Sequence, residues 1–160
     1  MKYACDTGAV ISLASSKFSD LIFKEYTIIL TPTVIQELHD FDRYSDFLGQ
    51  MAGNILKRNF KIEHAEKKVD LRLSSADGEV FSLALEKKYL ALTDDVHAAR
   101  VAQEKLNLKS YHSFYLLLQL YKKKKITKDE LKEEINTILR KRNWLKGALG
   151  KYALEITETL

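Results

Sequence analysis

Short apolar runs alternate with longer segments of helical periodicity along most of this 160-residue chain. The apolar runs predict strands near residues 2–5, 26–30, 60–63, 90–93 and 108–111. The longer segments predict helices over roughly residues 8–15, 32–42, 45–58, 75–88, 96–106, 112–123 and 128–142. This alternation is typical of a parallel sheet, because parallel neighbours need a crossover connection. We therefore predict an α/β fold with a central parallel sheet of about five strands flanked by helices.

The composition is that of one ordinary soluble domain, and it excludes several classes of protein. Cys5 is the only cysteine, so we expect no internal disulfide, no cysteine-based metal cluster and a reducing, cytoplasmic environment. No apolar stretch approaches the roughly 18 residues of a membrane span. Asp6 interrupts the N-terminal segment too early for a signal peptide. The net charge of +4 mildly favours a polyanionic partner such as nucleic acid.

Acidic residues stand where predicted strands end and helices begin. Asp6 ends the first buried strand, and Asp94 and Asp95 follow the strand that ends near Thr93. Ligands of open α/β sheets bind beyond the carboxyl ends of the strands, so these acids lie at the edge where a site is expected. Each acid alone also has a structural explanation as a helix-capping residue.

Two further acids are predicted to face inward from helices. On a helical wheel Glu37 lies at the rim of the apolar stripe that includes Phe41, so it can either reach into a cleft or border the core as a surface residue. Asp77 points the same way as Val80, and an inward carboxylate needs a partner. Either backbone N–H groups or a metal ion could be the partner of the Asp77 carboxylate. Glu79 points almost opposite and is expected at the solvent-exposed side.

The helical wheel also indicates which residue of the adjacent pair Asp94 and Asp95 faces inward. Traced back from the following helix, Asp95 falls with Ala99 and Ala102, so we interpret Asp95 as the inward residue and Asp94 as a support or cap. Several carboxylates in one partly desolvated cleft repel one another, and a divalent cation relieves this repulsion. Carboxylate and water ligands suit Mg²⁺ or Mn²⁺, while the lack of paired His or Cys argues against Zn²⁺.

Four segments carry these acids in a defined order: residues 5–11 (CDTGAVI), 30–38 (LTPTVIQEL), 76–86 (ADGEVFSLALE) and 92–100 (LTDDVHAAR). In this order and spacing they resemble the PIN-domain family of nucleases. The resemblance covers roughly residues 1–125 and implies a three-layer α/β/α fold. Residues 126–160 are interpreted as a C-terminal helical extension packed on the same domain.

The resemblance implies a metal-dependent endoribonuclease that uses Mg²⁺ or Mn²⁺. Motif by motif, Asp6, Glu37 and Asp77 match the first three family acids, and the last falls in the Asp94–Asp95 pair, where we favour Asp95 as the ligand. The expected catalytic set is Asp6, Glu37, Asp77 and Asp95, and the expected metal ligands are Asp6, Asp77, Asp94 and Asp95. The ion would orient and deprotonate a water that attacks phosphorus, and the family implies 5′-phosphate and 3′-hydroxyl products.

The same resemblance leaves the biological setting open. Similar proteins include VapC-type toxins and stand-alone prokaryotic PIN domains. A homodimer and an antitoxin-like partner protein are therefore expectations of the family. A catalytically silent PIN-like module that binds protein or RNA is the alternative.

Basic residues form three clusters that favour contacts to the phosphates of single-stranded RNA. A structural explanation is stronger for the lysine run 122–125, since cations at a helix C-terminus are favoured by the dipole. Trp144, beyond the last cluster, can stack a base. The candidate contacts are Lys57, Arg58, Lys122, Lys123, Arg140 and Arg142.

Other enzyme classes with acids at strand ends do not fit. A haloacid-dehalogenase-type phosphatase needs a second Asp two residues after the first, where this chain has Gly8. A receiver domain carries its acid pair after the first strand, whereas here the pair follows a later one. No Walker-type glycine–lysine loop is present.

Overall fold

The computed structural model describes residues 1–160 and contains one five-stranded sheet. All neighbouring strands are parallel, and their order is β3-β2-β1-β4-β5. The chain builds one half of the sheet with β1 to β3 and the other half with β4 and β5, so the strand order reverses between β1 and β4. The strands are β1 (Lys2–Cys5), β2 (Thr27–Leu30), β3 (Lys61–Ile62), β4 (Leu90–Leu92) and β5 (Ser110–Tyr111).

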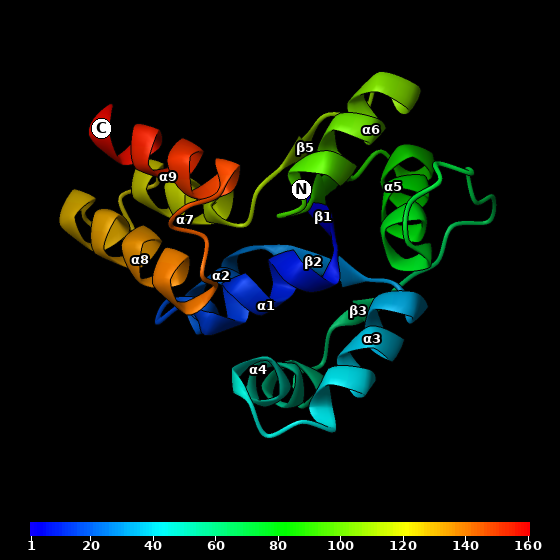
Figure 1. Ribbon diagram of the computed structural model, residues 1–160, viewed down its shortest axis with the longest axis horizontal. Helices are drawn as coiled ribbons and strands as arrows, with labels where there is room; N and C mark the ends of the chain where they lie inside the picture. The colour runs from blue at the N-terminus through cyan, green and yellow to red at the C-terminus, as the bar shows by residue number, and fades with distance from the viewer.

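Helices flank this sheet on both faces, which confirms the predicted three-layer α/β/α architecture (Figure 1). They are α1 (Thr7–Ser15), α2 (Ser19–Glu25), α3 (Pro32–Asp42), α4 (Phe47–Leu56), α5 (Ser75–Lys87), α6 (Val96–Leu106), α7 (Phe114–Lys122), α8 (Lys128–Lys141) and α9 (Ala148–Glu158). The predicted helix ranges did not include α2, and α9 was predicted only as part of the helical extension over residues 126–160. Neither helix begins with a side-chain N-cap, and α2 buries only Ile22, so both lack the signals used to find helices. None of the helices is long and apolar enough to cross a membrane.

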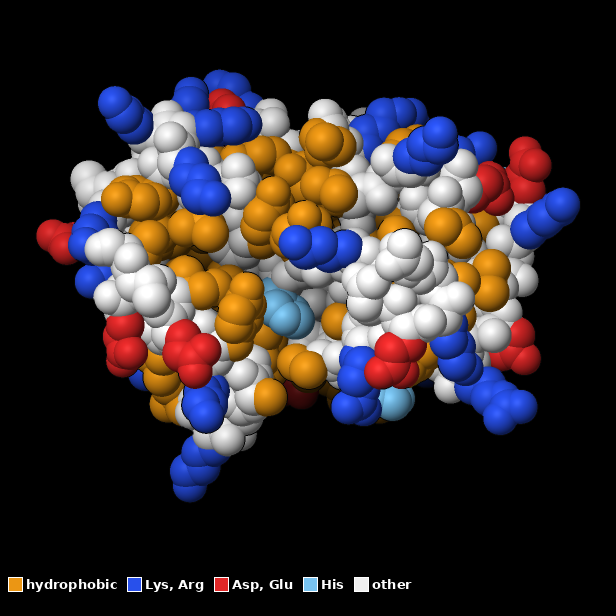
Figure 2. All heavy atoms as spheres, turned by 90° about the horizontal axis from the view of Figure 1, so that it is seen from above, with side chains coloured by type: hydrophobic (Ala, Val, Ile, Leu, Met, Phe, Trp, Pro, Cys, Tyr) orange, Lys and Arg blue, Asp and Glu red, His pale blue; other side chains and the backbone are white.

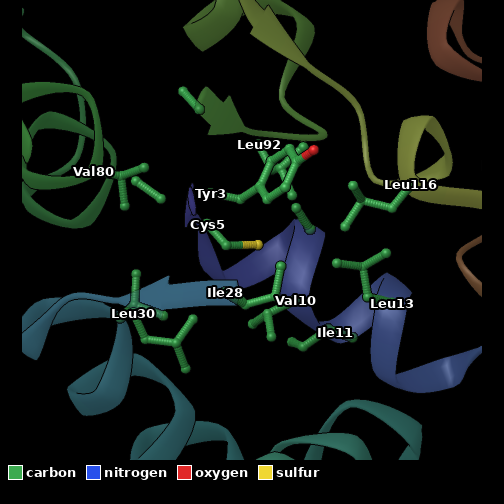
Figure 3. Close-up of a cluster of buried hydrophobic side chains, with 14 of the residues drawn as sticks. Tyr3, Cys5, Val10, Ile11, Leu13, Ile28, Leu30, Val80, Leu92 and Leu116 are labelled. Carbon is green, nitrogen blue, oxygen red and sulfur yellow. The ribbon is translucent and has the colours of Figure 1, made fainter. Parts of the chain in front are cut away.

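The hydrophobic core forms where β1, β2 and β4 meet the helices (Figure 3). Side chains of these strands, such as Cys5 and Leu92, lie close to Val80 of α5 and Leu116 of α7. The last three residues of β1 are all buried, as expected for a central parallel strand covered on both faces. The core therefore fixes the carboxyl ends of β1 and β4, where Asp6 and Asp94 follow.

The segment after α7 packs back onto the start of the chain. The helix α8 begins with a capping box, in which Thr127 and Glu130 satisfy each other's backbone N–H groups. Its side chains then tie it to the end of α1: Lys141 Nζ donates to the Ser15 carbonyl at 2.7 Å, and Glu134 accepts from the Lys17 N–H at 3.0 Å. In Figure 1, α8 lies beside α1, and its C-terminal end points toward the middle of the molecule.

An apolar groove lies between β5, α7 and α9. Tyr111, Phe114 and Leu118 line it together with Tyr152 and Ile156 of α9. Figure 2 looks at the molecule from the side where α9, β5 and α6 lie in Figure 1, and it shows hydrophobic side chains gathered around a hollow. This groove is separate from the acidic cleft described next, and the two share no lining residue.

Candidate active site

A cleft of about 360 Å³ opens at the carboxyl edge of β1 and β4. It brings together all five acids that the sequence singles out, although they come from four separate segments of the chain. Three follow strands, since Asp6 comes after β1 and Asp94 and Asp95 come after β4; one more lies on α3 and one in the first turn of α5. The five are Asp6, Glu37, Asp77, Asp94 and Asp95.

Asp6 and Asp94 form the inner part of the cleft. Asp6 is 5% exposed, and its Oδ1 accepts from the Ala9 N–H at 2.7 Å as the N-cap of α1. Burial, and then the charge of Asp94, raise the pKa of Asp6 to about 8. Burial also raises the pKa of Asp94. One Asp94 oxygen accepts from the Ser113 N–H at 2.7 Å, whereas Oδ2 is buried without any hydrogen-bond partner.

Glu37, Asp77 and Asp95 form the outer part. Burial raises the pKa of Asp77, and the charges of Asp95 and Glu37 add to this effect. Glu37 accepts a hydrogen bond from the Thr7 hydroxyl, so the first residue of α1 holds a side chain of α3 in place. The three outer acids are more accessible to solvent than Asp6.

The side chains of the Asp94–Asp95 pair have the opposite orientation to the one predicted. Asp95 is exposed and is the N-cap of α6, accepting from the Ala98 N–H at 3.0 Å, while Asp94 points inward. A helical wheel does not apply at Asp95, because the backbone there is extended, with φ −85° and ψ 105°. Successive side chains of an extended segment alternate in direction, so a helical period assigns the wrong one.

The prediction that Glu79 is exposed is also wrong. Glu79 is 3% exposed and accepts from the backbone N–H and the hydroxyl of Thr33, and Lys68 Nζ lies 4.0 Å away. The face of α5 that carries Glu79 packs on the start of α3 rather than facing water. A carboxylate there is favoured by the unpaired N–H groups and the dipole of α3, so Glu79 has a structural role outside the cleft.

The donors in the cleft fit a hard divalent cation. All five acids offer carboxylate oxygens, and Asp94 Oδ2 is a buried acceptor that lacks a partner. No three Asp, Glu, His or Cys side chains are arranged to hold an ion by themselves. Mg²⁺ does not require such a cage, since it usually binds one or two carboxylates, keeps several waters and takes phosphate oxygens of the substrate. The inner pair Asp6 and Asp94 matches this mode.

The sequence model of the PIN domain matches residues 2–159. The chain belongs to the PIN-domain family. No match was found among curated proteins. PIN domains are generally nucleases and typically bind divalent metal ions. The cleft of this PIN domain, with its carboxylates at the carboxyl edge of the sheet, is where that chemistry is expected.

Only one of the six basic residues predicted to contact RNA lies in the cleft of this PIN domain. Arg142 is that residue. Lys123 instead packs over the ring of Tyr26, which precedes β2 and therefore marks the opposite edge of the sheet. Arg58 pairs with Asp20 on α2 at 2.6 Å. Lys57, Lys122 and Arg140 are also absent from the lining of the cleft.

Two groups were missed as parts of the PIN-domain site. The hydroxyl of Thr7 holds Glu37, and the N–H of Ser113 holds Asp94. Trp144 lines the cleft next to Arg142, whose guanidinium lies 5.0 Å from the centre of the indole ring. The signal for Thr7 and Ser113 was available in principle, since both follow predicted strands at the carboxyl edge. Trp144, by contrast, is predicted from the sequence to stack a base, and the structure places it at the cleft.

Proposed function

We propose that this protein is a metal-dependent endoribonuclease that hydrolyses phosphodiester bonds of single-stranded RNA. The observation that carries the proposal is the convergence of five carboxylates in one cleft, with the unpartnered oxygen of Asp94 at its inner end. A cleft with this excess of negative charge would repel RNA unless a cation occupied it. The basic character of the chain, with a net charge of +4, supports a polyanionic substrate.

Asp6 and Asp94 would hold Mg²⁺ or Mn²⁺, and Asp77 and Asp95 would act from the outer part of the cleft through water. The bound ion supplies Lewis-acid chemistry, which lowers the pKa of a water and neutralises charge on the phosphoryl oxygens. Glu37, held by Thr7, is placed to orient a water molecule. In the overall reaction water oxygen bonds to phosphorus, the bond from phosphorus to the 3′ oxygen breaks, and that oxygen takes up a proton.

Cleavage of an end-labelled single-stranded RNA tests the proposal. We expect cleavage with Mg²⁺ or Mn²⁺, no cleavage with EDTA, and a loss of at least about 100-fold in Asp6→Asn. The exposed Asp40→Asn variant on α3 is the matched control and should cleave normally. Equal cleavage in all samples would show a contaminating nuclease. No cleavage together with no Mn²⁺ binding by calorimetry would favour the silent binding module instead.

A role as the toxin of a toxin–antitoxin pair is a finer proposal within this function. It would add an antitoxin-like partner protein and a homodimeric assembly. Induction of the wild-type chain in a bacterial host should then arrest growth, and induction of Asp6→Asn at the same protein level should not. Normal growth with an active nuclease would instead favour a role in RNA processing.

A further inference from the structure

Arg142 lies in the acidic cleft without an ion-pair partner. It lines the cleft with Asp6 and Asp94, yet none of the ion pairs in the structure includes it. Its Nε is buried and has no hydrogen-bond partner. A buried donor on a charged group is costly when it is unpaired, so this arrangement favours a ligand that brings acceptor oxygens.

The backbone at the end of α8 fixes the position of Arg142. Arg142 is the C-cap, and Asn143 adopts the left-handed conformation with φ 57°. The Trp144 N–H then donates to the Leu139 carbonyl at 2.8 Å, and the Asn143 N–H donates to the Arg140 carbonyl at 3.1 Å. These two bonds form a Schellman motif, which turns the chain sharply and leaves Arg142 and Trp144 side by side at the cleft.

The guanidinium group also has a defined place against α1. A Cβ atom on Gly8 would lie 3.7 Å from a terminal nitrogen of Arg142, so the guanidinium rests near the first turn of that helix. On its other side it lies over the ring of Trp144. Both contacts orient the group while leaving its donors free of carboxylate partners.

We propose that Arg142 binds the scissile phosphate of the RNA, so that a residue of the C-terminal segment completes the active site. This inference rests on the proposed nuclease function. One divalent cation would offset the charge of the two inner carboxylates, and Arg142 is the only positively charged side chain that lines the cleft. A phosphodiester carries a single negative charge and two free oxygens, which suits the planar fork of a guanidinium.

The main competing explanation is that Arg142 only neutralises Asp6 and Asp94. A neutralising role predicts that removal of Arg142 tightens metal binding, because a positive charge leaves the neighbourhood of the ion. It also predicts that Arg142→Lys, which keeps the charge, binds the phosphate as well as the wild type does. The two explanations therefore differ in a binding measurement as well as in activity.

Cleavage rates of Arg142→Gln and Arg142→Lys provide the first test. With saturating enzyme and Mn²⁺, we expect Arg142→Gln to cleave about 10- to 100-fold more slowly than the wild type. Arg142→Lys keeps the positive charge but loses the planar guanidinium with its paired donors. Its cleavage rate should therefore lie between those of the wild type and Arg142→Gln. Arg43→Gln, which removes an exposed arginine that pairs with Asp40, should cleave normally. Wild-type rates in both Arg142 variants would overturn the proposal.

Binding measured through Trp144 provides the second test, because Trp144 is the only tryptophan of the chain. A phosphorothioate RNA hexanucleotide is titrated in the presence of Ca²⁺ while the indole fluorescence is recorded. We expect about tenfold weaker binding by Arg142→Gln and unchanged binding by Arg43→Gln. Unchanged binding by Arg142→Gln, together with tighter Mn²⁺ binding, would overturn the proposal in favour of charge neutralisation.

The two measurements separate failure of this inference from failure of the nuclease function. If the wild type cleaves no RNA with either metal, the nuclease proposal fails, but the fluorescence titration still tests whether Arg142 holds a phosphodiester. If the wild type cleaves and the Arg142 variants bind and cleave as it does, only the role of Arg142 fails. Melting temperatures of all variants verify that they fold. If Arg142→Gln does not fold, the comparison of Arg142→Lys with the wild type still tests the proposal.

Discussion

At the scale of single residues, Asp6 has two structural roles that favour opposite charge states of its carboxyl group. As the N-cap of α1 it should carry negative charge, which the N–H of Ala9 and the helix dipole favour. As a buried neighbour of Asp94 it should be neutral, and the pKa of about 8 shows that burial and repulsion prevail. Without a cation, and between about pH 4 and pH 8, the folded protein therefore holds a proton at Asp6 that the unfolded chain releases.

This imbalance predicts an unusual dependence of stability on pH. The pKa of Asp6 is about 8 in the folded protein, against 3.8 for an ordinary Asp, so the folded state binds more protons between these two pH values. The contribution of Asp6 to the free energy of unfolding must then fall as the pH rises from about 4 to about 8. In EDTA, Asp6→Asn should melt at a higher temperature than the wild type at pH 8, with a smaller difference at pH 5. A lower melting temperature for Asp6→Asn at pH 8 would contradict this.

The reversed orientation of Asp94 and Asp95 predicts unequal effects of two matched substitutions. Asparagine caps helices as well as aspartate does, so Asp95→Asn should leave α6 intact. In Asp94→Asn the side chain can still accept from the Ser113 N–H, but the charge beside Asp6 is lost. We expect Asp94→Asn to reduce RNA cleavage at least about tenfold more than Asp95→Asn does. The opposite order would restore the assignment made from the helical wheel.

At the scale of helices and strands, the sequence predicted the features that depend on local periodicity. It did not predict the features that depend on contacts between elements far apart in the chain. The seven predicted helices and five predicted strands all occur, because apolar stripes and caps such as Thr31 before Pro32 are local signals. The cleft was also predictable, since parallel strands bring their carboxyl ends to one edge. The burial of Glu79 could not be predicted in this way. A helical wheel describes only α5 itself and does not show that the start of α3 packs beside Glu79.

The buried position of Glu79 predicts a stability effect that an exposed residue would not have. Glu79→Ala removes the acceptor of the Thr33 N–H and leaves that donor at the start of α3 without a partner. We expect a loss of about 1–3 kcal/mol in the free energy of unfolding, measured by urea denaturation. Lys87→Ala, on the same helix but exposed, should cost clearly less. Equal effects would mean that the contact with α3 does not form.

At the scale of the whole molecule, the C-terminal helices are part of the domain rather than an accessory to it. The PIN-domain match extends to residue 159, well beyond the motifs at residues 5–100. The helix α8 packs on α7 and α1, and its C-terminal turn brings Arg142 to the cleft. The same segment therefore contributes both to the core and to the wall of the site.

These contacts predict that residues 1–125 do not fold alone. Four side chains of α8, namely Leu131, Ile135, Ile138 and Leu139, are at most 1% exposed. Burying each one stabilises a protein by roughly 1.5–3 kcal/mol, and the net stability of a domain is only about 5–15 kcal/mol. Their loss would remove most of that margin and expose the apolar partners on α1 and α7. We expect a cooperative thermal transition for the full chain and none for residues 1–125, followed by circular dichroism. A cooperative transition in the fragment would instead show that the sheet and its first seven helices form an independent core, and Arg142 would then belong to a separable attachment.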